Sequence, residues 1–215
     1  MKVIIPESLN EIKLHQYQKW LKVSDNNDDN NFLKQKMVEI FCNISLRDVL
    51  NIKSTDIDLI IDDLNKVFNQ EPKFIDRFDY NKKRFGFIPK LDDITFGEYV
   101  DLDNYLPDWH NMHLAMNVLF RPITLENKKG YFIEDYDGSD KHDMRNITLD
   151  VVFGAVVFFW NLKNELLNIT LNYLGKQTPV DLPPAIKDFL KSGDGINRFM
   201  DWPKGMFEDL MKLQD

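Results

Sequence analysis

Residues 87–99 read FIPKLDDITFGEY, and residues 5–17 read IPESLNEIKLHQY, so the chain carries nearly the same motif twice. When one residue is skipped in the later copy, an Ile-Pro pair, a leucine, an isoleucine and a final tyrosine fall in register. An internal repeat indicates the overall architecture of a chain, so it is considered before individual helices and strands are predicted. We therefore interpret the chain as two copies of one helical unit, packed about a pseudo-two-fold axis.

The later copy of the motif predicts an extended segment that turns sharply into a helix. Thr95 stands at a helix N-cap with Glu98 three residues on, which is the spacing of a capping box. Ile94 and Tyr99 have the spacing of a hydrophobic staple, which fixes the angle of entry into the helix. The earlier copy has Lys13 where the capping hydroxyl should be, so we expect its helix to start less firmly.

The repeat continues downstream, where residues 37–46 (MVEIFCNISL) align without gaps to residues 116–125 (MNVLFRPITL). Chance similarity of two amphipathic segments is the alternative. The fold predicted from the repeat is mainly α: two tandem repeats of a three-helix unit, with small β-hairpins between and within the repeats. The expected boundaries are 1–70 for helical repeat 1, 71–90 for a β-hairpin linker, 91–175 for helical repeat 2 with its inserted hairpin, and 176–215 for a C-terminal tail of short helices.

Apolar periodicity predicts the helices of the first unit. One helix is expected over about 14–23, followed by a polar, turn-prone loop, and a second carries its apolar stripe over 32–44. A third is expected to be capped by Ser54 or Thr55 and to run to Phe68.

Alternation of apolar and polar residues predicts strands next to the second unit. Residues 74–87 alternate as a two-stranded hairpin does, and residues 130–136 read as one strand of a second hairpin. Helices are expected over 96–105 and from near Asp108. A final helix is expected from Thr148 to about Leu174; its stretch 151–160 is apolar on all sides, which indicates burial.

Composition narrows the class of protein. The 215 residues include 27 basic and 35 acidic ones, with a net charge of -8, and no basic run exceeds residues 82–84, so we argue against nucleic acid as a partner. The most apolar run, 151–162, is shorter than the roughly 20 residues that span a bilayer, so no membrane is expected. Cys42 is the single cysteine and no signal peptide is recognisable, which favours folding in a reducing cytoplasm.

The chain offers few candidates for chemistry. His110 and His113, three apart on a helix with Asp108 nearby, could bind a metal, but a hydrogen-bonded core histidine is the simpler interpretation of His113. Residues 134–140 are as acidic as a calcium loop but lack its alternating ligands, so we interpret them as a solvated turn. We expect no catalytic residue, cofactor or metal.

The tail from Lys176 onward carries apolar side chains that could dock in a partner's groove, or equally fold back over the chain's own helices. The candidate partner-binding residues are Phe199, Trp202, Met206, Phe207 and Leu210.

The motif at 87–99, the block ending LFRPI at 119–123, the acidic strand at 131–138 and the apolar helix at 151–160 together carry a resemblance. Over about residues 3–173 the chain resembles virion-associated proteins of tailed bacteriophages, in particular proteins encoded among the structural genes of crAss-like phages and their relatives. The tail is not covered.

The resemblance implies a non-enzymatic virion structural or assembly protein, associated with the portal or tail apparatus or packaged as cargo. Its partners would be other phage structural proteins (portal, tail or capsid-associated), with a homo-oligomer possible, and it would reside in the virion after synthesis in the host cytoplasm. The alternatives are a cytoplasmic tail assembly chaperone that is not retained in the virion, a small metal-dependent enzyme that uses His110 and His113, and a cytoplasmic regulator of the host.

Overall fold

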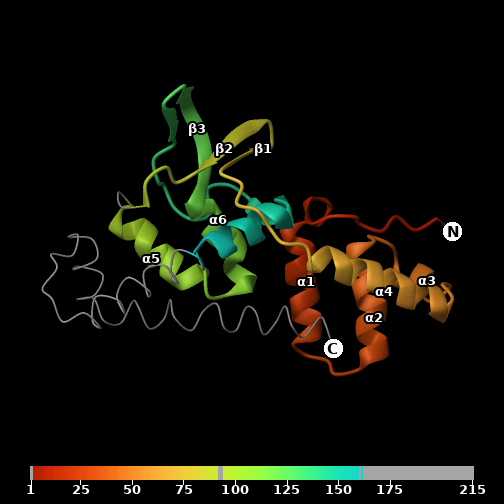
Figure 1. The fold of residues 1–215 in the computed structure, drawn as a ribbon. Coiled ribbons are helices and arrows are strands. Elements are labelled where there is room, and N and C mark those ends of the chain that lie inside the picture. Colours follow the sequence, from red (N-terminus) through yellow and green to blue (C-terminus); the bar gives the residue numbers. More distant parts are fainter. Residues whose placement is uncertain (1, 92–93, 160, 162–215) are drawn as a thin grey trace, which may run out of the picture.

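The computed structural model describes residues 2–91, 94–159 and 161, and Figure 1 shows how their elements are arranged. Helices α1 to α4 gather at one end of this part, α5 lies at the other, and the β3–β4 hairpin projects away from both. The elements are η1 (Leu9–Glu11), α1 (Leu14–Ser24), α2 (Asn30–Phe41), α3 (Leu46–Val49), α4 (Ser54–Phe68), β1 (Arg77–Tyr80), β2 (Lys83–Phe87), α5 (Phe96–Tyr105), η3 (Trp109–Asn111), α6 (Met112–Leu119), β3 (Phe120–Asn127), β4 (Gly130–Ile133) and η4 (Met144–Asn146), followed by a helix over 149–159.

The prediction of a mainly α fold made of two three-helix repeats is wrong. The described residues combine helices with a four-stranded antiparallel sheet in the order β1-β2-β3-β4. Both expected hairpins exist, β1 with β2 and β3 with β4. The two hairpins are not separate, because β2 also pairs with β3 and so joins them into one sheet.

The two copies diverge at the position that Asn43 and Pro122 share in the alignment. Asn43 has a φ of 51°, a left-handed turn that ends α2 and turns the chain into α3. Pro122 cannot continue a helix because it lacks an amide hydrogen and its ring clashes with the preceding turn. It lies instead within β3, opposite Phe85 of β2, and its carbonyl accepts from the Glu134 amide at 2.9 Å. The same stretch therefore becomes a turn in one copy and a strand in the other.

The tyrosines that end the two motifs lie in unrelated surroundings. Tyr17 is fully buried, and its ring centroid lies 5.0 Å from that of Trp109, 5.4 Å from that of Phe153 and 6.1 Å from that of Phe68. Tyr99 is only half-buried, on a short helix that buries little else. Similar local sequence therefore does not place the copies in equivalent tertiary positions.

Helix starts follow the local prediction in part. The capping box of α5 is confirmed: the Thr95 amide donates to Glu98 Oε2 at 2.6 Å, and the Glu98 amide donates to Thr95 Oγ1 at 3.3 Å. In α1 the Lys13 side chain makes no cap hydrogen bond, but the Lys13 amide donates to the Gln16 side chain at Oε1, 2.8 Å away. The expected cap of α4 is wrong, since Ser54 is already helical and Lys53 stands at the N-cap.

The helix over 149–159 begins within one residue of the predicted start and is buried over its first two turns, as its sequence indicated. The first motif anchors it: the Leu149 amide donates to the Ile12 carbonyl and the Leu14 amide to the Ile147 carbonyl, each at 2.9 Å. Its Gly154 lies directly against the main chain before β1, because a Cβ built there would lie 2.2 Å from the Lys73 carbonyl oxygen. The predicted continuation to Leu174 lies outside the described residues.

Candidate functional site

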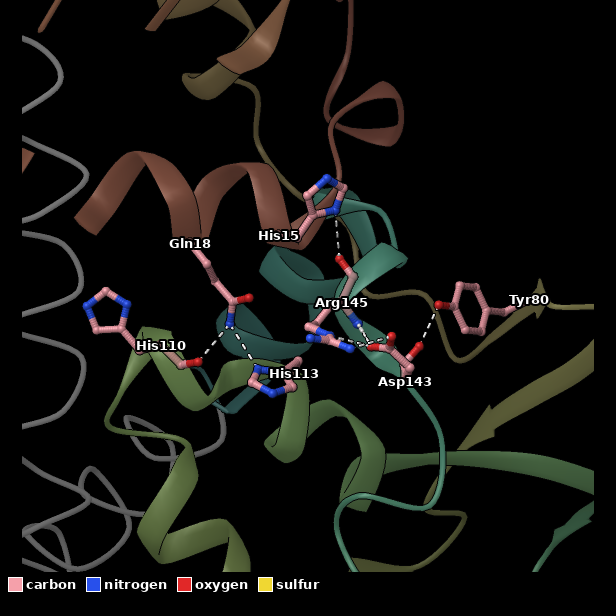
Figure 2. A network of polar contacts seen from close by, with 7 residues as sticks. All are labelled: His15, Gln18, Tyr80, His110, His113, Asp143 and Arg145. Carbon is pink, nitrogen blue, oxygen red and sulfur yellow. Dashed lines mark hydrogen bonds and ion pairs between the residues drawn. The ribbon is translucent and has the colours of Figure 1, made fainter. Parts of the chain in front are cut away.

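A network of polar contacts surrounds His113 between α1, α6 and η4 (Figure 2). The buried Gln18 amide nitrogen lies 2.9 Å from the Trp109 carbonyl, 3.1 Å from the His110 carbonyl and 3.2 Å from His113 Nδ1. Burial, reinforced by the nearby Arg145 cation, holds the pKa of His113 below its ordinary value. The predicted hydrogen bond of His113 is confirmed and joins α6 to α1, although the ring is half-buried and not in the core as expected.

The two histidines proposed as a metal pair do not converge. Figure 2 shows the His110 ring directed away from His113. His110 Nε2 lies 3.7 Å from Asp25 Oδ2 at the end of α1, whereas His113 Nδ1 faces Gln18. Within the described residues no group of three histidine, cysteine or carboxylate side chains is placed to hold a metal ion.

The same network ties the short helix η4 to its neighbours. Arg145 Nε and Nη2 each donate to the Asp143 carboxylate at 2.8 Å, which lowers the pKa of Asp143 to about 2. The Tyr80 hydroxyl donates to the Asp143 carbonyl at 2.5 Å, and His15 Nδ1 lies 3.2 Å from the Arg145 carbonyl. The Tyr80 and His15 contacts run from a side chain to the main chain of another element, so the network connects α1, β1 and η4.

The acidic segment after β4 is paired with cations. Glu134 lies 3.7 Å from Lys83, 3.5 Å from Lys141 and 3.6 Å from His142. Asp137 shares Lys141 at 3.5 Å. The Glu134 and Asp137 carboxylates thus face basic side chains and share Lys141.

A buried ion pair joins α5 to β3, and the sequence analysis missed it. Arg121 Nη2 lies 2.6 Å from Glu98 Oε1, with side chains 10% and 4% exposed. The guanidinium also lies over the Tyr136 ring, 5.7 Å from its centroid. Tyr136 donates to Asp101 of α5, and burial together with that carboxylate raises the pKa of Tyr136. The one signal in the sequence is that Arg121 stands in an apolar block, but its spacing does not identify Glu98 as the partner.

Two apolar side chains are exposed on the opposite side of α5. Phe96, in the first turn, is 81% exposed, and Val100, one helical turn later, is 36% exposed. Side chains four residues apart lie on the same face of a helix. With its other side held by the Glu98–Arg121 pair, α5 presents these two side chains to solvent in a fixed orientation.

The expected partner-binding side chains of the tail lie outside the described residues; they are Phe199, Trp202, Met206, Phe207 and Leu210. None of the helices that the structure describes is long and apolar enough to cross a membrane. Comparison of the chain with protein families, with curated proteins and with solved structures finds no match.

Proposed function

We propose that this chain is a non-enzymatic structural or assembly protein of a tailed bacteriophage, and that it acts by binding portal, tail or capsid-associated proteins. It resides in the virion as a component of the portal and tail apparatus or as packaged cargo. The motifs that resemble virion-associated proteins of crAss-like phages support this assignment of class.

The observation that carries the proposal is that Phe96 is 81% exposed on a helix whose other side is held by the Glu98–Arg121 ion pair. Exposed aromatic side chains are enriched in protein interfaces, where they supply large contact areas at small entropic cost. The polar groups around His113 support the same conclusion, since their contacts connect elements of the fold.

The test is capture of phage proteins from infected cells with the tagged full-length chain, followed by mass spectrometry. Replacing Phe96→Ser should reduce capture of a phage structural protein at least tenfold. Leu59→Ser is the matched control, because Leu59 is 63% exposed on α4, at the other end of the described part. Equal capture by wild type and Phe96→Ser, or no phage structural protein in either sample, would contradict the proposal.

Mass spectrometry of purified virions separates two forms of this function. A component of the particle is recovered at a fixed copy number, whereas a tail assembly chaperone is captured from the cytoplasm and missing from the particle. Deleting residues 176–215 tests the tail as a second contact, and unchanged incorporation of the truncated chain would remove Trp202 and its neighbours from the interface.

A further inference from the structure

Strand β4 is the terminal strand of the sheet in the described part, and one of its edges is turned away from β3. The Phe132 carbonyl accepts from Thr124 Oγ1 of β3 at 3.3 Å, and the Glu134 amide donates to the Pro122 carbonyl of β3 at 2.9 Å. Main-chain groups of alternate residues point to opposite sides of a strand. Those of Tyr131 and Ile133 therefore point to the free edge.

Strand β4 is only four residues long, but within those residues it lacks the prolines and charged side chains that usually block strand addition. The strand reads Gly-Tyr-Phe-Ile, without a proline or a charged residue, and Phe132 at its centre is 62% exposed. Edge strands are normally protected by prolines, lysines, bulges or a covering element. An apolar edge of this kind is a template for another strand.

The exposed residues of the hairpin continue the apolar face of the sheet. At the base of β3, Phe120 lies opposite Phe87, and both rings are buried in the core. The register shift in β3 then places Leu125 opposite Phe132, and Leu125 is 57% exposed. The opposite face is marked by Tyr131, whose ring reaches Gly86, so Leu125 and Phe132 lie on the side that faces the core at the base of the hairpin.

We propose that a second copy of this chain pairs with β4 through the antiparallel β4 strand of the partner, about a two-fold axis at Phe132. Residues equally distant from Phe132 then face each other, so Tyr131 and the partner's Ile133 exchange main-chain hydrogen bonds. Two-fold pairing of one surface with itself is the commonest form of homo-oligomer. The two four-stranded sheets become one continuous sheet.

Charge and side-chain packing agree with this register. It brings Lys129, in the hairpin turn, toward Asp135 of the partner subunit, which follows that subunit's β4, and the symmetric pair forms at the other end of the interface. Phe132 meets the partner's Phe132 at a non-hydrogen-bonded position, where side chains approach most closely, and Leu125 flanks this pair on each side. A slip by one residue would turn the aromatic side chains to opposite faces.

The register is tested by cysteine cross-linking of the full-length chain under mild oxidation. Facing Cα atoms at a non-hydrogen-bonded position lie about 4.5 Å apart, within the range that a disulfide spans. Phe132→Cys should therefore give mainly covalent dimer. Leu125→Cys is the matched control, since it shares the exposed face but lies about 14 Å from its counterpart, three strand spacings away.

Sedimentation of the unmodified chain should give a dimer, and Ile133→Pro should shift it to monomer because proline removes an edge amide donor. A monomeric wild type, or equal cross-linking of Phe132→Cys and Leu125→Cys, would overturn the proposal. Both measurements use the purified chain alone. Their outcome is therefore independent of whether phage proteins are captured through Phe96.

Discussion

Replacing Gly154→Ala tests how closely the last described helix approaches the chain before β1. The added Cβ would lie 2.2 Å from the Lys73 carbonyl oxygen, 3.0 Å from the Lys73 carbonyl carbon and 3.2 Å from the Phe74 Cα. These are main-chain atoms, so no side-chain rotation relieves the contact. The helix and the segment must separate by about 1 Å, which weakens packing such as the Phe74–Phe158 stack, whose centroids lie 4.5 Å apart.

Two effects of opposite sign determine how much Gly154→Ala changes the free energy of unfolding. Alanine favours a helix over glycine by about 1 kcal/mol, whereas overpacking a tight interior costs typically about 1–3 kcal/mol, occasionally more. Because the contact is with rigid main chain, we expect clash to prevail and the free energy of unfolding to fall by about 1–2 kcal/mol. The melting temperature should fall by roughly 2–8 °C.

Urea unfolding followed by circular dichroism measures this change, and Gly97→Ala is the control. Gly97 lies in α5, where the nearest atom to an added Cβ is 3.8 Å away. At this position alanine's higher helix propensity is not opposed by a clash, so the free energy of unfolding should rise by up to about 1 kcal/mol. If Gly154→Ala stabilised the protein as much as Gly97→Ala does, the close approach of Lys73 to the helix would be refuted.

Three further perturbations test the other contacts. Thr95→Ala should lower the unfolding free energy by about 0.5–2 kcal/mol in urea titrations, while Thr95→Ser should retain most of it. Arg121→Met should lower the unfolding free energy by about 3–5 kcal/mol, because Glu98 is left buried without its cation. Adding Glu98→Leu to Arg121→Met should recover part of this loss. A double variant that is no more stable than Arg121→Met would contradict the buried pair. Burial lowers the folded-state pKa of His113 and His142 from 6.5, so the unfolded chain binds more protons there. Stability should be fully present above pH 6.5 and fall as the pH drops toward the folded-state values, and a His113→Gln, His142→Gln variant with an unchanged pH profile would contradict this.

Local features of the sequence predicted local structure well. The Thr95 box, the hairpin of β1 and β2, and the buried helix after Thr148 depend on contacts between residues near one another in the chain. Capping and alternation are read directly from such spacing. The candidate site followed the same rule, because the sequence identified His113 as a bonded histidine but not Gln18 as its partner, 95 positions earlier.

The prediction of the fold was wrong because it missed the pairing of strands that are far apart in the sequence. Nothing in the spacing of residues 83–87 and 120–122 shows that β2 and β3 are neighbours, and this pairing is what converts two hairpins into one sheet. The repeat aligned residues 120–122 with the end of a helix, whereas they begin strand β3, where Pro122 cannot continue a helix. The Glu98–Arg121 pair was missed for the same reason, since it depends on α5 lying beside β3.

Strand β3 connects the stable and the exposed parts of the molecule, which makes the proposed interface testable without disturbing the fold. Phe120 at its base is fully buried, and the next residue, Arg121, is held by Glu98, whereas Leu125 is already 57% exposed. Substitutions at exposed positions usually change stability by less than about 0.5 kcal/mol. A change at Phe132, which is 62% exposed, should therefore alter association while leaving the unfolding transition in place. If the unfolding free energy of the monomer fell by several kcal/mol in Phe132→Cys, the hairpin would belong to the core and the proposed edge would not be free.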